Sequence, residues 1–459
     1  MKSRIPPGTV ETETIAAVAT PPGRGGVGIV RISGPLVQNV ARALIKAVLN
    51  PRYAMYCDFL AEDNSVIDQG IVLYFPAPHS FTGEDVLELQ GHGGPVVLEM
   101  LLTRVTGLGA RIARPGEFSE RAFLNNKLDL SQAEAIADLI DSASQQAAKS
   151  AVKSLQGEFS KKIQSINENI TALRMHVEAA IDFPEEEIDF LSDEKISDGV
   201  QVIGESLTAV LQQASKGVLL REGITLVLAG RPNAGKSSLM NLLSGKDAAI
   251  VTHIAGTTRD LINEYINLDG VPLKLVDTAG IRAVENEVEE QGVRRALAEI
   301  EYADGVLLLI DLNEYRDWSA GITDLLEELP DNDKVIIILN KVDLIDEMPD
   351  VPVDFPYPVI PLSAKLGTGH DELLSKIKQI FALDLSGEGS FIARSRHIDA
   401  LNRALNHLRQ GKEQLSTHHA GELLAEELRL SHESLGEITG DFSSDDLLGR
   451  IFSSFCIGK

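Results

Sequence analysis

The amino-acid sequence predicts a multidomain chain that combines an α/β part with an all-α part. Its 459 residues are enough for about three domains of ordinary size. Residues 223–383 alternate strand-like and helix-like stretches around a glycine-rich loop, which is typical of a mainly parallel sheet. The stretches on both sides of that region, residues 127–222 and 384–459, show long helical periodicity.

Composition limits the class of protein further. The chain is 44% hydrophobic and 24% charged, so it can bury a sizeable core. The formal net charge of −26 disfavours non-specific adhesion to nucleic acid and favours solubility. The two cysteines, Cys57 and Cys456, are too few for a disulfide framework or a zinc cluster. Because no apolar run resembles a signal peptide or a membrane span, we expect a soluble, cytoplasmic protein.

The first 126 residues mix strand and turn patterns and predict an N-terminal α+β domain. A basic run there is compatible with an anion-binding surface or with an ordinary solvated face. Its members are Arg104, Arg111, Arg114, Arg121 and Lys127. The predicted elements are a turn at residues 23–26, strands at 27–33, 71–75 and 86–90, and a helix at 96–105.

Helical periodicity begins near Lys127. Ser131 and Glu134 fit a capping box that opens the first helix. Because helical stretches flank residues 223–383, the simplest arrangement is one helical domain with the α/β domain inserted between its halves. We therefore expect an N-terminal domain at 1–126, helical halves at 127–222 and 384–459, and the inserted domain at 223–383. Helices are predicted at residues 133–142, 147–180, 193–213, 392–408 and 420–430.

The inserted region carries apolar runs that predict buried strands. Asp269–Gly270 separates two of these runs and is a strong hairpin signal. The predicted strands are residues 224–229, 261–268, 271–276, 306–310, 335–339 and 357–362, followed by a helix at 371–381.

Residues Gly230–Ser238 match the phosphate-loop pattern G-x-x-x-x-G-K-[ST] between a strand and a helix. Glycines let consecutive backbone N–H groups turn toward an anion at a helix N-terminus. Lys236 can reach the outer phosphates of a nucleotide, and Ser237 can offer its hydroxyl to Mg²⁺. The nucleotide-binding residues predicted here are Asn233, Ala234, Gly235, Lys236, Ser237 and Ser238.

Three further motifs follow the phosphate loop in order, at residues 277–280, 340–343 and 363–365, and the last two predict that the base is guanine. The Asp343 carboxylate can accept from the N1–H and the exocyclic amine of guanine, whereas adenine would leave it unpaired. Asn340 can bond the base and brace its loop, and Asp277 can hold Mg²⁺. The ordered set predicts GTP rather than ATP. Its members are Asp277, Thr278, Ala279, Gly280, Asn340, Lys341, Asp343, Ser363, Ala364 and Lys365.

The loop at residues 252–258, before the strand predicted at 261–268, is expected to become ordered when GTP binds, because a threonine there can contact Mg²⁺ and the γ-phosphate. Its nucleotide-binding residues are Thr252, His253, Ile254, Ala255, Gly256, Thr257 and Thr258. Ras-type enzymes place a water-orienting glutamine directly after the Asp-x-x-Gly motif, but here that residue is Ile281. The candidates for this task are a cation near Asn233 and one of Arg282, Glu285, Glu287 and Glu289.

Several blocks give the chain a resemblance, over nearly its whole length, to the MnmE (TrmE) family of tRNA modification GTPases. This family belongs to the TrmE-Era-like P-loop GTPases. Many families share the GTPase motifs, so the N-terminal blocks and the Cys-Ile-Gly-Lys tail are the more specific ones. The blocks are Pro21–Gly28, Phe81–Glu88, Arg114–Phe123, Gly256–Asp260 and Phe455–Lys459.

The resemblance implies a potassium-activated GTPase whose nucleotide domains dimerise across their active faces. The family's K⁺ stands where an arginine finger would act, and its ligands match Asn233, Thr252, Ile254 and Thr257. The Mg²⁺ ligands match Ser237 and Thr258. The catalytic glutamate of the family matches Glu289, with Glu287 as a neighbouring alternative.

The resemblance also implies a folate-binding-like N-terminal domain that binds a tetrahydrofolate derivative, the 5,10-methylene or 5-formyl form, at a homodimer interface. The matching residues are Arg31, Glu88, Lys127 and Lys459. Cations suit the glutamate tail of folate, and a carboxylate suits its pterin edge. Cys456 is a second candidate catalytic residue, as a thiol that attacks the wobble uridine or carries an intermediate. A bland packed thiol explains Cys456 almost as well.

The implied function is GTP hydrolysis that, with a flavin (FAD)-dependent partner in a heterotetramer, adds a carboxymethylaminomethyl-type group at C5 of the wobble uridine of certain tRNAs. Because the net charge of −26 is unfavourable for holding tRNA, we expect the partner to supply much of the RNA-binding surface. A ribosome-assembly timer is one rival, which the N-terminal blocks disfavour. A dynamin-like membrane machine is another, but no amphipathic basic helix or lipid motif supports it.

Overall fold

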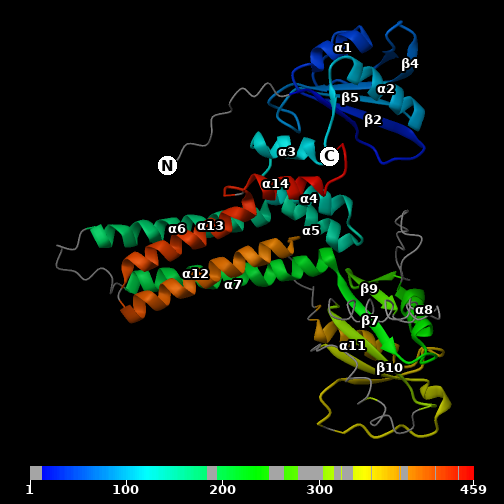
Figure 1. Cartoon of the computed structure of the whole chain (residues 1–459), viewed down its shortest axis with the longest axis vertical. Coiled ribbons are helices and arrows are strands. Elements are labelled where there is room, and N and C mark those ends of the chain that lie inside the picture. Colours follow the sequence, from blue (N-terminus) through cyan, green and yellow to red (C-terminus); the bar gives the residue numbers. More distant parts are fainter. Residues whose placement is uncertain are drawn as a thin grey trace, which may run out of the picture. The chain divides into compact units, whose positions relative to one another are not determined.

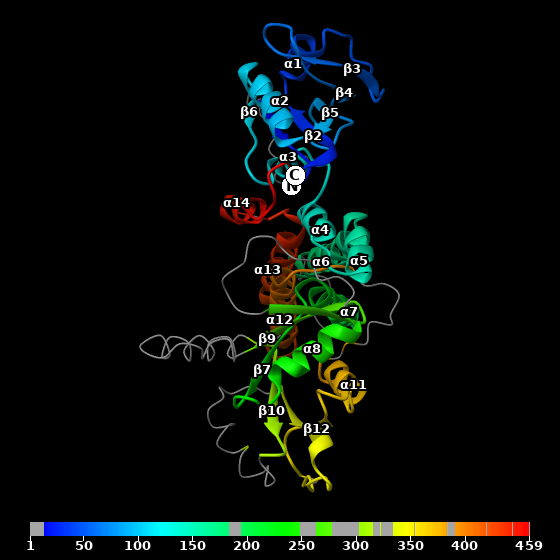
Figure 2. The same ribbon diagram turned by 90° about the vertical axis from the view of Figure 1, so that its right-hand side faces the viewer.

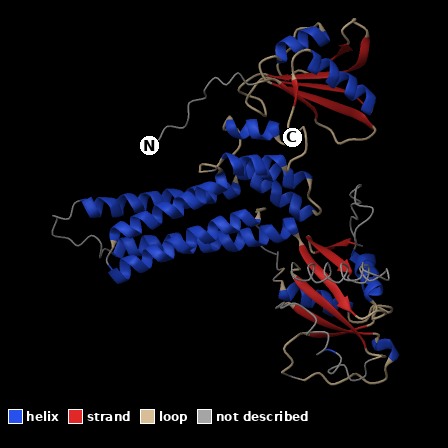
Figure 3. Cartoon of the chain, viewed as in Figure 1, coloured by secondary structure: helices blue, strands red, loops and turns tan. Residues whose placement is uncertain are grey.

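A computed structural model of the chain describes residues 13–182, 194–247, 263–277, 303–314, 322, 334–352, 354–381, 383, 391–418, 420–442 and 444–458. Figure 1 follows its course, and Figure 3 separates helices from strands, of which the latter form two six-stranded sheets. The predicted mixture of α/β and α parts is confirmed. Within these residues, no helix combines the length and the apolar character that a membrane span requires.

Contacts divide the chain into two compact units. The first comprises the chain up to Ala137, Leu155–Met175 and Ala425 onward, and the second comprises Asp138–Ser154 and His176–Leu424. Each unit therefore combines segments that are far apart in sequence. The four domain ranges expected from the sequence remain a prediction.

The sheet of the first unit has the strand order β3-β4-β5-β2-β1-β6. Its neighbours are antiparallel except for the parallel pair of β1 and β6. Helices α1 (Val37–Ile45) and α2 (Pro95–Gly107) cover one face, on which alternate strand residues such as Ile32 and Leu89 are buried. The strands are β1 (Ile15–Val18), β2 (Gly25–Ser33), β3 (Met55–Leu60), β4 (Val66–Phe75), β5 (Val86–Gly93) and β6 (Arg111–Ile112).

Glycines extend two of the predicted strands. In the pairing of β2 with β5, Gly25 lies opposite Gly93. A β-carbon on Gly93 would lie 2.7 Å from the carbonyl oxygens of Gly25 and Val27, so this close approach requires glycine. The turn predicted at residues 23–26 is therefore wrong from Gly25 onward, because β2 already begins there.

The predicted capping box is displaced by two residues. Helix α4 (Leu130–Ile140) begins one residue before Ser131, so Ser131 lies within the helix. Asp129 Oδ1 accepts from the Gln132 N–H at 2.9 Å, and Gln132 Oε1 accepts from the Asp129 N–H at 3.0 Å. This reciprocal pair is the capping box, with aspartate and glutamine in place of serine and glutamate.

The helix predicted at residues 147–180 is in fact two helices, α5 (Gln145–Leu155) and α6 (Glu158–Asp182). Gly157 separates them with a φ of +82°, a left-handed conformation that ends a helix. The later helices are longer than predicted, and α3 and α14 had no clear sequence pattern. The bounds are α3 (Glu117–Leu124), α7 (Glu194–Glu222), α12 (Ser395–His418), α13 (Gly421–Thr439) and α14 (Asp445–Ser453).

The sheet of the second unit has the order β12-β11-β10-β7-β9-β8 and is parallel except for the β8–β9 hairpin, as the sequence predicted. Helices α8 (Lys236–Asp247) and α11 (His370–Ile380) cover one face of this sheet. Helices α7 and α12 pack along each other, as both views show (Figures 1 and 2). The strands are β7 (Ile224–Gly230), β8 (Asn263–Leu268), β9 (Val271–Asp277), β10 (Gly305–Asp311), β11 (Val335–Asn340) and β12 (Val359–Leu362).

Candidate nucleotide and N-terminal sites

The carboxyl ends of five parallel strands meet at one edge of the second sheet. The phosphate loop follows β7 at this edge, and β9 ends there with Asp277. Asn340 ends β11, and Ser363 follows β12 directly. Motifs separated by more than a hundred residues in sequence are therefore neighbours in space.

The phosphate loop passes from β7 into the first turn of α8 with three residues at positive φ, beginning with Gly230 at +140°. Asn233 has a φ of +63° and Gly235 a φ of +103°. The Lys236 ammonium donates to the carbonyl oxygens of Gly230 at 2.8 Å and Arg231 at 3.0 Å. The side chain of Lys236 therefore links the end of the phosphate loop back to its beginning. The backbone N–H groups at the start of α8 follow directly in sequence.

The Asn340 side chain connects two loops at this edge of the sheet by hydrogen bonds. Asn340 is 2% exposed, and its Nδ2 donates to the Ala234 carbonyl at 2.8 Å. Its Oδ1 accepts from the Ala364 N–H at 3.0 Å. A β-carbon on Gly235 would lie 2.1 Å from Asn340 Nδ2, so only glycine allows this approach. One amide therefore joins the phosphate loop to the loop expected to bind guanine.

The Asp343 carboxylate is exposed and oriented by a buried hydroxyl. Ser363, with no exposed surface, donates from Oγ to Asp343 Oδ1 at 2.6 Å. The neighbouring Lys341 forms an ion pair with Asp311 at the end of β10. The exposed Asp343 carboxylate therefore still has oxygen lone pairs that can accept further hydrogen bonds. They suit the two N–H donors on the edge of guanine.

Magnesium suits the oxygen donors that this edge presents. Asp277 is a carboxylate that is 5% exposed, and Ser237 carries an exposed hydroxyl in the first turn of α8. Ser238 and Lys365, which are also predicted to bind the nucleotide, are exposed. The remaining predicted residues lie outside the described residues. They are Thr252, His253, Ile254, Ala255, Gly256, Thr257, Thr258, Thr278, Ala279, Gly280, Arg282, Glu285, Glu287 and Glu289, together with Lys459 in the N-terminal site.

In the first unit, Arg31 and Glu88 lie opposite each other on β2 and β5. Arg31 Nε donates to Glu88 Oε1 at 3.0 Å, and the guanidinium lies 5.7 Å from the ring centroids of Phe81 and Phe118. Gln90 donates to the other oxygen of Glu88 at 3.3 Å. A carboxylate, a guanidinium and an aromatic ring 37% exposed at Phe81 fit the polar edge and flat body of a pterin.

The C-terminal tail reaches the same site. The Gly458 carbonyl accepts from Arg31 Nη1 at 3.4 Å, and the Cys456 carbonyl accepts from the Gly116 N–H at 3.3 Å. Cys456 is exposed. By contrast, burial raises the pKa of Cys57 to about 11, so that thiol stays protonated at neutral pH. Cys456 is the better candidate nucleophile of the two.

Lys127 is bonded to the loop between β4 and β5 that also carries Phe81. Its ammonium donates to the Pro78 carbonyl at 2.8 Å, and Asn125 Nδ2 donates to the Thr82 carbonyl at 2.7 Å. The structure therefore brings Arg31, Glu88 and the tail into direct contact, while Lys127 is linked to them through this loop.

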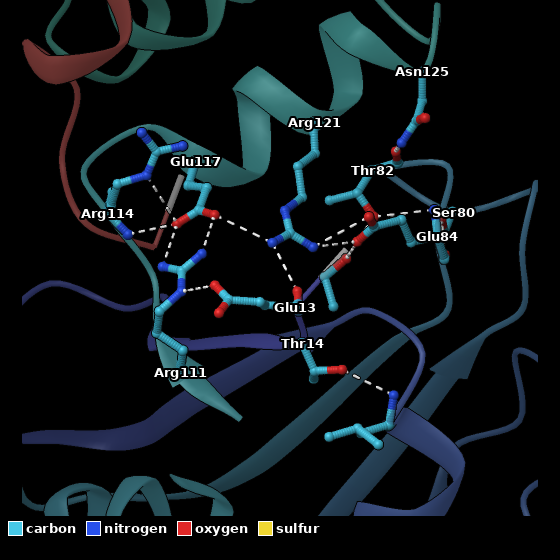
Figure 4. Close-up of polar contacts among 12 residues, drawn as sticks. Glu13, Thr14, Ser80, Thr82, Glu84, Arg111, Arg114, Glu117, Arg121 and Asn125 are labelled. Carbon is cyan, nitrogen blue, oxygen red and sulfur yellow. Dashed lines mark hydrogen bonds and ion pairs between the residues drawn. The ribbon is translucent and has the colours of Figure 1, made fainter. Parts of the chain in front are cut away.

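Three members of the basic run, Arg111, Arg114 and Arg121, form an ion-pair scaffold with neighbouring glutamates. The solvated-face interpretation fits Arg114, which is 65% exposed, but not the buried Arg121. In Figure 4 the Arg121 guanidinium lies between Glu84 and Glu117, with nitrogen–oxygen distances of 2.9 and 3.2 Å. Arg111 binds Glu117 at 2.7 Å, and Arg114 binds Glu120 at 2.9 Å. The role of these glutamates was not predicted from the sequence, although all three lie in the blocks that carry the resemblance.

Comparison with known proteins assigns both units to one family. The model described as "GTP-binding protein TrmE N-terminus" matches residues 14–127, and "MnmE helical domain" matches residues 130–456. The proteins named tRNA modification GTPase MnmE from Vibrio parahaemolyticus and Vibrio cholerae are each 57% identical, covering 98% of this chain and 100% of their own. The Proteus mirabilis protein of that name is also 57% identical, covering 98% and 99%.

Among solved structures, the G domain of the T. maritima FeoB iron transporter is 26% identical, covering 35% of this chain and 98% of its own, with a TM-score of 0.27. That score is too low to bear on the fold of the whole chain. The two family models and the full-length relatives decide the assignment. The chain belongs to the MnmE (TrmE) family of tRNA modification GTPases.

Proposed function

We propose that this chain is a potassium-activated GTP hydrolase that, with an FAD-dependent partner, adds a carboxymethylaminomethyl-type group at C5 of the wobble uridine of certain tRNAs. The strongest support is the edge at which Asn340 joins the phosphate loop to the Ser363–Lys365 loop, in a chain 57% identical to named tRNA modification GTPases. This edge has the parts that a guanine nucleotide requires.

In the nucleotide site, Asp343 accepts from the guanine edge, and Lys236 and the backbone of the phosphate loop bind the phosphates. Ser237 and Thr258 would hold Mg²⁺, which supplies charge neutralisation between the β- and γ-phosphates. Asn233, Thr252, Ile254 and Thr257 would hold K⁺ in place of an arginine finger. Glu289 would orient the attacking water when two nucleotide domains dimerise.

In the N-terminal site, Arg31, Glu88, Lys127 and Lys459 would hold a tetrahydrofolate derivative at a homodimer interface. The folate supplies the one-carbon unit for the modification. The Arg31–Glu88 pair supports this role, because it places a cation and a carboxylate beside an exposed aromatic ring. Cys456 would be the nucleophile that this site presents to the tRNA base, carried by the tail that Arg31 binds.

The test is GTP turnover by the purified chain in K⁺ and in Na⁺ at equal ionic strength. We expect the turnover number to be about tenfold or more higher in K⁺, because a cation at the transition state supplies what the absent arginine finger would. Glu289→Ala should slow turnover while sparing nucleotide affinity, and Glu287→Ala, which removes the alternative candidate, should leave turnover near the wild-type value. Equal rates in both salts would contradict the cation role, and an unchanged Glu289→Ala would reassign the water-orienting role.

A further inference from the structure

The β8–β9 hairpin connects the two parts of the chain that are expected to sense the γ-phosphate. In sequence, the threonine-rich loop that ends at Asp260 precedes β8, and Asp277 at the end of β9 opens the Asp-x-x-Gly motif. The turn Asp269–Gly270 is at the opposite end of the hairpin. Since β9 has seven residues, its turn lies about 20 Å from the nucleotide edge.

That turn is bonded to the connection between α4 and α5. Ser144, which is 6% exposed, donates from Oγ to the Gly270 carbonyl at 2.7 Å. The same oxygen accepts from the Ala147 N–H at 3.1 Å and thereby caps α5. One hydroxyl has a single proton and two lone pairs, so both bonds form together. The turn and the start of α5 therefore share one atom.

The fit at this contact is also steric. Gly270 has a φ of +96°, and a β-carbon there would lie 2.9 Å from Gln146 Cβ. Two residues after the turn, the Pro272 carbonyl oxygen would lie 2.3 Å from a β-carbon on Gly223. Gly223 joins α7 to β7, so the hairpin touches the helical segments at two glycine-dependent points.

The end of α4, which leads into Ser144, forms ion pairs with residues at the end of α7 and just before α12. Asp138, 4% exposed at its side chain, accepts from Arg221 Nε at 2.7 Å and from Arg394 Nη2 at 2.8 Å. Arg221 lies in the last turn of α7, and Arg394 directly precedes α12. A buried carboxylate between two guanidiniums resists separation, because losing either partner leaves charge uncompensated. Displacement of the turn would therefore be transmitted to α4, α7 and α12 together.

We propose that the β8–β9 hairpin reports the nucleotide state to the helical segments through the Ser144–Gly270 hydrogen bond. This rests on the proposed function, in which GTP hydrolysis drives a change of shape. Ser144 is a positioning residue, because it lies at the end of the hairpin away from the nucleotide. Its loss uncouples the helical segments from the nucleotide without removing any group that contacts GTP.

Three variants separate this role from a merely structural one. Ser144→Ala removes both the bond to Gly270 and the cap on α5. Ser144→Asp keeps an acceptor for the Ala147 N–H but cannot donate to the Gly270 carbonyl. Ser142→Ala is the matched control, since Ser142 lies in the same connection and, among the described residues, its Oγ bonds the Asp138 carbonyl at the end of α4, at 2.6 Å, and not the hairpin.

The measurement is hydrogen exchange of the full chain with GDP and with a non-hydrolysable GTP analogue. In the wild type and in Ser142→Ala, we expect amides of β8–β9 and of residues 138–154 both to change exchange rate between the two nucleotides. In Ser144→Ala and Ser144→Asp, we expect the hairpin to respond as before and the response of residues 138–154 to fall about fivefold or more. GTP turnover should stay within about twofold of the wild type in all three variants.

A full response of residues 138–154 in Ser144→Asp would overturn the proposal, since the helix cap alone would then account for any effect of Ser144→Ala. A wild-type chain in which the hairpin responds and residues 138–154 do not would also overturn it. If neither region responds in the wild type, the nucleotide-driven change of shape itself fails, and the proposed function fails with it in that respect.

Discussion

At the residue scale, Glu117 is the buried carboxylate of the first unit that accepts hydrogen bonds from three arginines. Its carboxylate is 3% exposed and accepts from Arg111, from Arg121 and from the Arg114 N–H. Burial alone would raise the pKa of Glu117, but these hydrogen bonds outweigh it and lower the pKa from 4.5 to about 2. Because the folded pKa lies below the unfolded one, the stability that Glu117 contributes is present above about pH 4.5 and is lost as the pH falls toward 2.

We therefore expect Glu117→Gln to lower the free energy of unfolding of this unit by about 3 kcal/mol at pH 7, because the buried Arg121 then keeps Glu84 as its one carboxylate partner among the described residues and Arg111 loses its bidentate one. The measurement is hydrogen exchange of β2 and β5 amides. Glu120→Gln is the control, since its partner Arg114 is 65% exposed and such pairs contribute about 1 kcal/mol or less. The difference between the two variants should shrink near pH 2. Equal effects at pH 7 would contradict the scaffold role.

Residue roles with a local signature could be predicted, and those with distant partners could not. The phosphate loop and Asp343 occur in motifs whose spacing states their chemistry, and the structure brings their described members to one edge. Glu117 has no such signature. Its own partners, Arg111 and Arg121, are close in sequence, but their spacing does not show that the carboxylate is buried. The rest of the network is distant, because Arg121 also binds Glu84 and the Glu13 carbonyl, 37 and 108 residues away. Sequence spacing carries no information about such a partner.

At the element scale, the phosphate loop depends on how closely it approaches β11. Gly235→Ala would place a β-carbon 2.1 Å from Asn340 Nδ2 at a φ of +103°. We expect the Kd for GTP to rise about tenfold or more, because the amide can no longer hold both loops. The measurement is titration with a fluorescent guanine nucleotide.

Gly245→Ala is the matched control for that substitution. It lies in α8, the helix that begins directly after Gly235, and a β-carbon there meets nothing within 4 Å. Alanine also favours a helix over glycine by about 1 kcal/mol, so binding should stay within about twofold of the wild type. Similar affinity in both variants would mean that the connection of the two loops by Asn340 is not required for nucleotide binding.

Elements with sustained periodicity were predictable, and short elements that depend on tertiary partners were not. The buried strands β10 and β11 stand out as apolar runs, and α2 as a helical one. Strand β1 has four residues and exists because β2 and β6 flank it. The break at Gly157 was missed because the apolar spacing continues across it, and a single left-handed residue does not disturb that pattern.

At the scale of the whole molecule, each unit combines segments that the sequence separates widely. The site at Arg31 lies in the first unit and the nucleotide edge in the second, and the chain passes between the units several times. Alternation of strands and helices predicted the parallel sheet, and long helical stretches predicted the α part. Potassium activation, folate binding, the FAD-dependent partner and the homodimer remain predictions, because they concern groups and chains that a single sequence pattern does not place.

The central claim is that GTP turnover by this chain serves the modification of tRNA. The most direct measurement is nucleoside analysis of tRNA from a strain that lacks the chain and is supplied with the wild type, with Lys236→Ala or with Gly245→Ala. We predict that C5-modified wobble uridine is absent from the deletion strain and from the Lys236→Ala strain, and is restored by the wild type and by Gly245→Ala. Unchanged modified uridine in the deletion strain, or full restoration by Lys236→Ala, would contradict the account.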